Sequence, residues 1–78
     1  MIYNRKAFGV VISRLRTKKD ISQECFSAMA GIARSHLVML ENGKKTVRLD
    51  TFCNIADALG VLPSELMRMV EEETENSK

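Results

Sequence analysis

Residues 23–44 read QECFSAMAGIARSHLVMLENGK, and this stretch decides the fold. It predicts two short helices separated by a tight turn at Gly31, because glycine readily adopts the left-handed conformation that ends a helix. Ser22 is expected to cap the first helix, and the second is expected to span about residues 34–42 and end at Gly43. Apolar side chains at helical spacing would hold the pair together: Phe26, Ile32, Leu37 and Leu40.

The sequence before this stretch predicts one longer helix. It is expected to run from about Asn4, which would cap it, to about Lys19, with the apolar residues Phe8 and Ile12 on one face. Gly9 lies inside this helix, where glycine is tolerated at a cost of about 1 kcal/mol relative to alanine.

The sequence after this stretch predicts two more helices. A basic loop over residues 44–48 leads to a helix over about 49–59, and Pro63 opens a fifth helix that runs to about Glu72. We expect residues 1–70 to form the domain and residues 71–78 to form a frayed polar tail. Clean period-two alternation is absent, so the sequence predicts an all-α fold, a compact domain of five helices.

The composition limits the kinds of protein that the chain can be. Seventy-eight residues, 45% apolar and 28% charged, allow one small globular domain. The chain has two cysteines, Cys25 and Cys53, and one histidine, and their spacing matches neither a zinc site nor a disulfide framework. We therefore expect no metal. We expect both thiols to be buried or half-buried and the protein to be cytoplasmic. No nucleophile–base pair or phosphate-binding glycine loop is visible, so neither catalysis nor a cofactor is expected.

The charge is distributed unevenly along the chain. Residues 1–48 carry ten Lys/Arg and three Asp/Glu, a net charge of +7. Residues 49–78 carry two Lys/Arg and seven Asp/Glu, a net charge of −5. This polarity indicates a polyanionic partner for the basic part.

The two short helices have the helix-turn-helix layout, in which the second helix enters the major groove of DNA. The chain resembles the Cro/repressor-type (XRE-like) helix-turn-helix family, whose domain is lambda-repressor-like. The resemblance covers about residues 5–70, and its motifs are Ile21-Ser22-Gln23-Glu24, Ala30-Gly31-Ile32, Leu40-Glu41-Asn42-Gly43-Lys44, Leu49-Asp50-Thr51-Phe52 and Ala56-Asp57-Ala58-Leu59-Gly60-Val61. It implies a transcriptional regulator that binds double-stranded DNA in a sequence-specific way.

The resemblance also implies a role for individual residues. The base contacts would come from Arg34, Ser35, Val38 and Met39. The phosphate contacts would come from Gln23, Asn42, the Gly43 backbone, Lys44 and Lys45. Arg16 and Glu41 match a pair that joins the first helix to the third in this family.

The chain departs from the family pattern at five positions. Ala33 stands where a hydroxyl residue usually caps the recognition helix, so about 1 kcal/mol of capping is expected to be lost. Val38 and Met39 replace residues that are usually polar or basic, and they can touch thymine methyl groups but cannot donate hydrogen bonds. Val47 and Arg48 replace the usual proline and hydroxyl residue. We therefore expect modest specificity, or A·T-rich sites in which Arg34 reads guanine.

One domain of this size contacts too few base pairs for tight specific binding, so a homodimer on a palindromic operator is expected. Apolar residues occupy more than one face of the fifth helix, and we expect Leu66, Met69 and Val70 to supply a dimer interface. A second hypothesis is a protein-interaction module, such as an antitoxin or accessory regulator. It would bind a partner through the apolar Val38–Met39 patch or the acidic tail.

Overall fold

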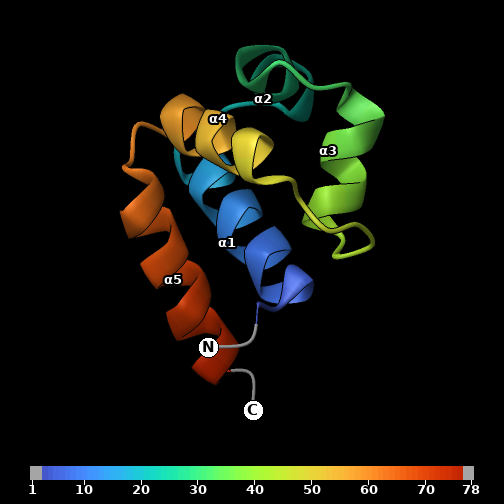
Figure 1. The fold of residues 1–78 in the computed structure, drawn as a ribbon. Helices are drawn as coiled ribbons and strands as arrows, with labels where there is room; N and C mark the ends of the chain where they lie inside the picture. The colour runs from blue at the N-terminus through green and yellow to red at the C-terminus, as the bar shows by residue number, and fades with distance from the viewer. Residues whose placement is uncertain (1–2, 77–78) are drawn as a thin grey trace.

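The structure, a computed structural model, describes residues 3–76. Within that range the secondary structure consists of five α-helices, as the sequence predicts. They are α1 (Arg5–Lys18), α2 (Gln23–Ala30), α3 (Arg34–Glu41), α4 (Leu49–Leu59) and α5 (Pro63–Asn76). Helix α1 runs through the middle with α3 on one side and α5 on the other, while α2 and α4 cover one end (Figure 1).

The helix boundaries follow the short-range signals of the sequence. The Asn4 side chain accepts hydrogen bonds from the first turn of α1, and Ser22 Oγ accepts one from the Cys25 amide at 3.0 Å. Gly31, Gly43 and Gly60 all have positive φ angles and follow the ends of α2, α3 and α4. Ala33 and Arg48 precede α3 and α4 without a side-chain cap.

The last helix is longer than predicted. It continues to Asn76 instead of ending near Glu72, so residues 71–76 are helical and not a frayed tail. Thr74 is buried, so packing against the rest of the fold favours this extension. Its hydroxyl is satisfied within the helix, where it donates to the Val70 carbonyl at 2.8 Å. Residues 77 and 78 of the expected tail lie outside the described residues.

The core is formed where α1 meets the other helices. Phe8 stacks on Phe52 with ring centroids 5.5 Å apart, which ties α1 to α4. The fully buried large side chains come from all five helices: Phe8, Ile12, Phe26, Leu37, Leu40, Ile55, Leu59, Leu66 and Val70. Burial of these apolar side chains drives the folding of a small domain and holds α3 in a fixed place against α1.

Gly9 allows α1 and α3 to approach closely. A Cβ atom at this position would lie 2.5 Å from the Glu41 carbonyl oxygen and 2.6 Å from that of Leu40. No side chain fits at such distances, so the glycine is required by the crossing of the two helices. The expectation that Gly9 is merely tolerated inside α1 is wrong.

The two cysteines lie on the surface. Cys25 and Cys53 are both exposed, contrary to the expectation of buried or half-buried thiols. Among residues 3–76, no helix has both the length and the apolar character that a bilayer crossing requires.

Candidate nucleic-acid interface

Helix α3 presents a short exposed face on the outside of the molecule. Leu37 and Leu40 are fully buried and anchor the helix, which turns its opposite side to solvent. That side carries the four predicted base-contact residues: Arg34, Ser35, Val38 and Met39. They line one open hollow of about 460 Å³. Arg34 and Ser35 are exposed, Val38 is half-buried and Met39 is 37% exposed.

The chemistry of this face suits the edges of base pairs. An arginine can donate two hydrogen bonds to guanine O6 and N7, which discriminates against a wrong base by about 1–3 kcal/mol. Ser35 can donate or accept a hydrogen bond, while Val38 and Met39 offer apolar contact to a thymine methyl group. The face can therefore read both a guanine and an adjacent thymine.

The segment after α3 carries exposed polar and basic side chains. Asn42, Lys44 and Lys45 are exposed. Gly43 is different, because it is buried and its amide donates to the Leu40 carbonyl at 3.2 Å. The phosphate contact of the Gly43 backbone stays a prediction, and the hydrogen bond to Leu40 shows that the amide already has one partner. The glycine also supplies a positive φ of 70°, which turns the chain so that the two lysines project from the end of α3.

Lys6 belongs to the same basic cluster, and the sequence analysis missed it. A Cβ atom on Gly43 would lie 2.8 Å from Lys6 Cγ, so the start of α1 packs directly against the turn that precedes Lys44. Lys6 is exposed. Its place could not be read from local spacing, because it depends on the crossing of α1 and α3. We call Lys6, Lys44 and Lys45 the lysine cluster.

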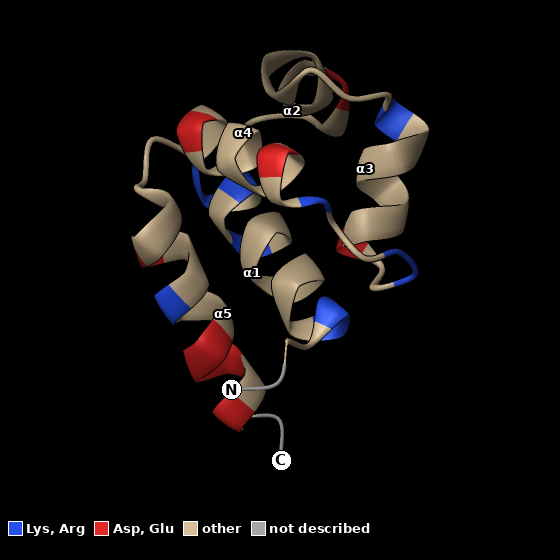
Figure 2. Ribbon diagram, in the orientation of Figure 1, with Lys and Arg blue, Asp and Glu red and all other residues tan. Residues whose placement is uncertain are grey.

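Charges of the two signs lie on different parts of the molecule. Figure 2 shows basic segments at the start of α1, at the start of α3 and in the loop after it, whereas acidic segments concentrate in the second half of α5. Helices α3 and α5 lie on opposite sides of α1. The uneven charge of the sequence is therefore also a spatial separation, with the positive side on the face of α3.

A buried ion pair connects three helices behind this face. Arg16 Nε donates to Glu41 Oε2 at 2.7 Å, and a second guanidinium nitrogen donates to Glu41 Oε1 at 3.1 Å. The two side chains are only 11% and 6% exposed. Arg16 also donates to the Ile21 carbonyl at 2.7 Å, which fixes the turn between α1 and α2. The predicted pair of Arg16 and Glu41 is thus present.

Gln23 is part of the same network. Its side-chain amide donates to Glu41 Oε1 at 2.9 Å, so the first residue of α2 is bound to the last residue of α3. An amide nitrogen carries two protons, and this bond uses one of them. The network therefore holds Gln23 in a defined position relative to the recognition helix.

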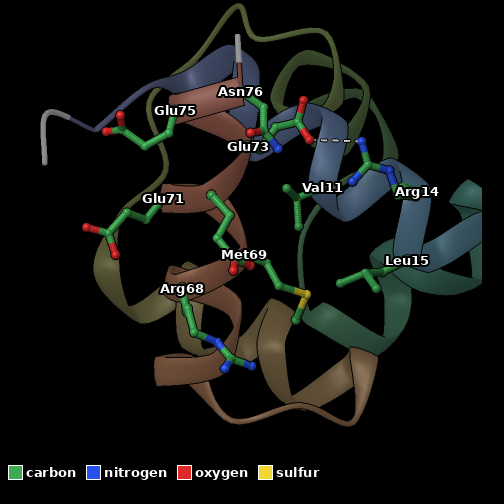
Figure 3. A pocket seen from close by; sticks show the side chains of 10 residues that line it. Val11, Arg14, Leu15, Arg68, Met69, Glu71, Glu73, Glu75 and Asn76 are labelled. Atoms are coloured by element: carbon green, nitrogen blue, oxygen red, sulfur yellow. Dashed lines mark hydrogen bonds and ion pairs between the residues drawn. The ribbon is translucent and has the colours of Figure 1, made fainter. Parts of the chain in front are cut away.

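The predicted dimer interface on α5 does not have the required exposure. Leu66 and Val70 have no exposed surface, because both are packed into the core of a single copy. Met69 is half-buried and points toward Leu15 of α1 (Figure 3). The prediction is wrong for Leu66 and Val70, since helical periodicity does not reveal which apolar face a neighbouring helix covers.

The open hollow beside Met69 has a net negative lining. It lies between α1 and α5 and has a volume of about 780 Å³. Arg14 forms an ion pair with Glu73 across it at 2.9 Å (Figure 3). Arg68, Glu71, Glu72 and Glu75 also line this hollow, so carboxylates outnumber arginines there and the net negative charge does not favour a nucleic acid.

The fold and this interface define the class of protein. The profile of the HTH_3 helix-turn-helix family matches residues 12–66. The chain therefore belongs to the HTH_3 helix-turn-helix family.

Individual relatives support the same assignment. Over 67 residues the chain is 39% identical to control protein C.MunI of a Mycoplasma species, covering 85% of this chain and 90% of that protein. It is 35% identical over 68 residues to the HTH-type transcriptional regulator y4dJ of Sinorhizobium fredii, covering 87% and 88% of the two chains. Among solved structures, the restriction-modification controller protein C.AhdI from Aeromonas hydrophila matches with a TM-score of 0.78 and 34% identity, covering 83% of this chain and 98% of that one.

Proposed function

We propose that this protein is a transcriptional regulator that binds double-stranded DNA in a sequence-specific way, with α3 in the major groove. The observation that carries the proposal is the position of the four base-reading side chains, which share one exposed face with the lysine cluster at its end. The relatives named as control proteins and as a transcriptional regulator support it. The similarity to C.AhdI supports a more specific role, which is regulation of the promoter of a restriction–modification system.

The protein binds its operator as a homodimer. The described chain measures 32 × 23 × 23 Å, and its recognition helix has only eight residues. Successive major grooves on one side of B-DNA lie ~34 Å apart, so one copy reaches one groove. Two copies related by a two-fold axis would double both the base contacts and the phosphate contacts on a palindromic site.

The test begins with selection of bound sequences from a random DNA pool, followed by titration of the selected site across a salt series. About four to six phosphate contacts per subunit predict a steep fall of log K with log salt, close to 0.9 for each contact. A flat salt response, or the absence of binding at low salt, would contradict the proposal. A reporter gene placed behind the selected site then measures whether binding changes transcription.

Two substitutions separate base reading from backbone binding. Arg34→Ala should weaken binding to the selected site by about 1–3 kcal/mol and leave binding to random DNA nearly unchanged. Lys44→Ala should weaken binding to both DNAs by the same factor. Arg68→Ala is the matched control, because Arg68 is an exposed arginine on α5, across α1 from the recognition helix. Equal losses for Arg34→Ala and Arg68→Ala would argue against base reading by α3.

A further inference from the structure

The second half of the exposed face of α3 is apolar. Four residues line the open hollow on this helix, and the two that donate hydrogen bonds, Arg34 and Ser35, lie in its first turn. Val38 and Met39 follow one turn later on the same side, because residues four apart share a helix face. A base pair that faces this Val38–Met39 patch meets no hydrogen-bond donor from it, so recognition there depends on apolar contact.

The two side chains of the patch differ in how firmly they are held. Val38 is half-buried, and its branched side chain has few rotamers, so its methyl groups have a defined position. Met39 is 37% exposed, and its unbranched thioether can adjust to the shape of a ligand. One fixed and one adaptable apolar side chain can therefore contact the same small apolar group.

Positive charge at both ends of α3 favours DNA as the molecule that covers the patch. Arg34 begins the helix, and Lys44 and Lys45 follow its end. Figure 2 shows these basic segments at the two ends of α3, and basic groups on both sides of a face attract a polyanion. We therefore build on the proposed function, in which α3 lies in the major groove. A protein partner of the patch is the competing outcome.

The major groove offers one apolar group to such a patch. It is the methyl group at C5 of thymine. Cytosine carries only hydrogen at C5, whereas 5-methylcytosine carries a methyl group at the same place as thymine. Burial of one methyl group against apolar side chains strengthens binding about fourfold. The patch therefore distinguishes a methylated pyrimidine from an unmethylated one, whichever base carries the methyl group.

Helix geometry limits where this pyrimidine lies. Four residues of an α-helix advance about 6 Å along its axis, and base pairs are stacked about 3.4 Å apart. The methylated pyrimidine therefore lies at most about two base pairs from the guanine that Arg34 is expected to contact.

We propose that the Val38–Met39 patch is a binding site for the C5-methyl group of a pyrimidine, so that the protein binds an operator with 5-methylcytosine at this position more tightly than the same operator with cytosine. Thymine at this position always supplies the methyl group. Cytosine supplies it only after methylation of the DNA. The methylation state of such a cytosine then controls how much of the operator is occupied.

Titration of matched duplexes with the wild type tests this site. The starting duplex is the sequence selected from the random pool, and each thymine is replaced in turn by uracil, which removes one methyl group and keeps the base pairing. We expect about a fourfold loss of affinity at one or two positions of each half-site and no change elsewhere. At those positions a 5-methylcytosine·guanine pair should bind about fourfold more tightly than a cytosine·guanine pair.

Two variants assign the methyl effect to the patch. Val38→Ala and Met39→Ala shorten the side chains without adding charge, and circular dichroism checks that both fold. The ratio of thymine to uracil affinity should fall from about fourfold toward one in these variants. Lys44→Ala is the control, because it should weaken binding to both duplexes equally and keep the ratio. An unchanged ratio in both patch variants would overturn the assignment.

The remaining outcomes separate the methyl site from the proposed function. Sequence-specific binding with equal affinity for all thymine and uracil duplexes, and for cytosine and 5-methylcytosine, would overturn the methyl site and leave the proposed function intact. Absence of DNA binding at low salt would overturn both. Unchanged binding of all duplexes by Val38→Ala and Met39→Ala would overturn the methyl site and leave the patch to a protein partner.

Discussion

At the scale of single residues, Gly9 has an importance that its position in a helix conceals. On helix propensity alone, Gly9→Ala should stabilise the protein by about 1 kcal/mol. The structure predicts the opposite sign, because the added Cβ would lie 2.5 Å from the Glu41 carbonyl oxygen. Helices α1 and α3 would have to separate, and overpacking of this kind costs about 1–3 kcal/mol or more.

The free energy of urea-induced unfolding measures this effect. Val10→Ala is the control, because Val10 is the next residue of α1 and is 44% exposed. We expect a clearly larger loss for Gly9→Ala than for Val10→Ala. Stabilisation by Gly9→Ala would show that the two helices do not cross as closely as described.

Tyr3 makes stability depend on pH in the alkaline range. Burial raises its pKa to about 12, from about 10 in the unfolded chain. Between these values the unfolded chain loses the phenolic proton and the folded chain keeps it, so stability falls as the pH rises through this window. Because Tyr3 is the single tyrosine of the chain, the absorbance of its phenolate measures the titration directly. The Tyr3→Phe variant should lack this component of alkaline destabilisation. A midpoint near 10 in the native protein would contradict the burial of the hydroxyl.

At the scale of helices, the Arg16–Glu41 pair determines how α1, α2 and α3 are joined. Either single substitution, Arg16→Met or Glu41→Leu, leaves one charge of a buried pair without its partner. We expect a loss of about 3–5 kcal/mol for each, because an uncompensated buried charge is costly. The double variant should lose much less than the sum, since both charges are then removed.

A double-mutant cycle from unfolding curves measures this coupling. Arg14→Met with Glu73→Leu is the matched control, because that ion pair is far more exposed, at 61% and 20%. Its coupling should be about 1 kcal/mol or less. Additive effects for Arg16 and Glu41 would mean that the pair does not join the helices. The hydrogen bond from Gln23 to Glu41 further predicts weaker DNA binding in Glu41→Leu.

At the scale of the whole molecule, the fold places Lys6 against Gly43, beside the face that we propose binds DNA. Lys6→Ala should reduce the slope of log K against log salt by about 1, as expected for the loss of one phosphate contact. Lys19→Ala is the control, because Lys19 follows the other end of α1, next to Gly60. Equal slopes for Lys6→Ala and the wild type would show that Lys6 does not contact a phosphate.

From the amino-acid sequence alone one could predict the five helices, most of their ends and the exposed face of α3. These features depend on interactions between residues at most four positions apart: apolar periodicity, the caps at Asn4 and Ser22, and glycines after helices. The end of α5 is the exception, because Thr74 is buried against the rest of the fold and the helix continues past its last apolar residue.

The way in which these helices use their surfaces follows from the packing of the folded chain. The need for glycine at position 9, the place of Lys6 beside Gly43 and the burial of Leu66 and Val70 all depend on helices that are distant in the sequence. A helical pattern shows that a residue is apolar and on which side of its own helix it lies. Whether that side meets the core, a second copy or DNA depends on which other helix packs against it, and this contact exists only in the folded chain.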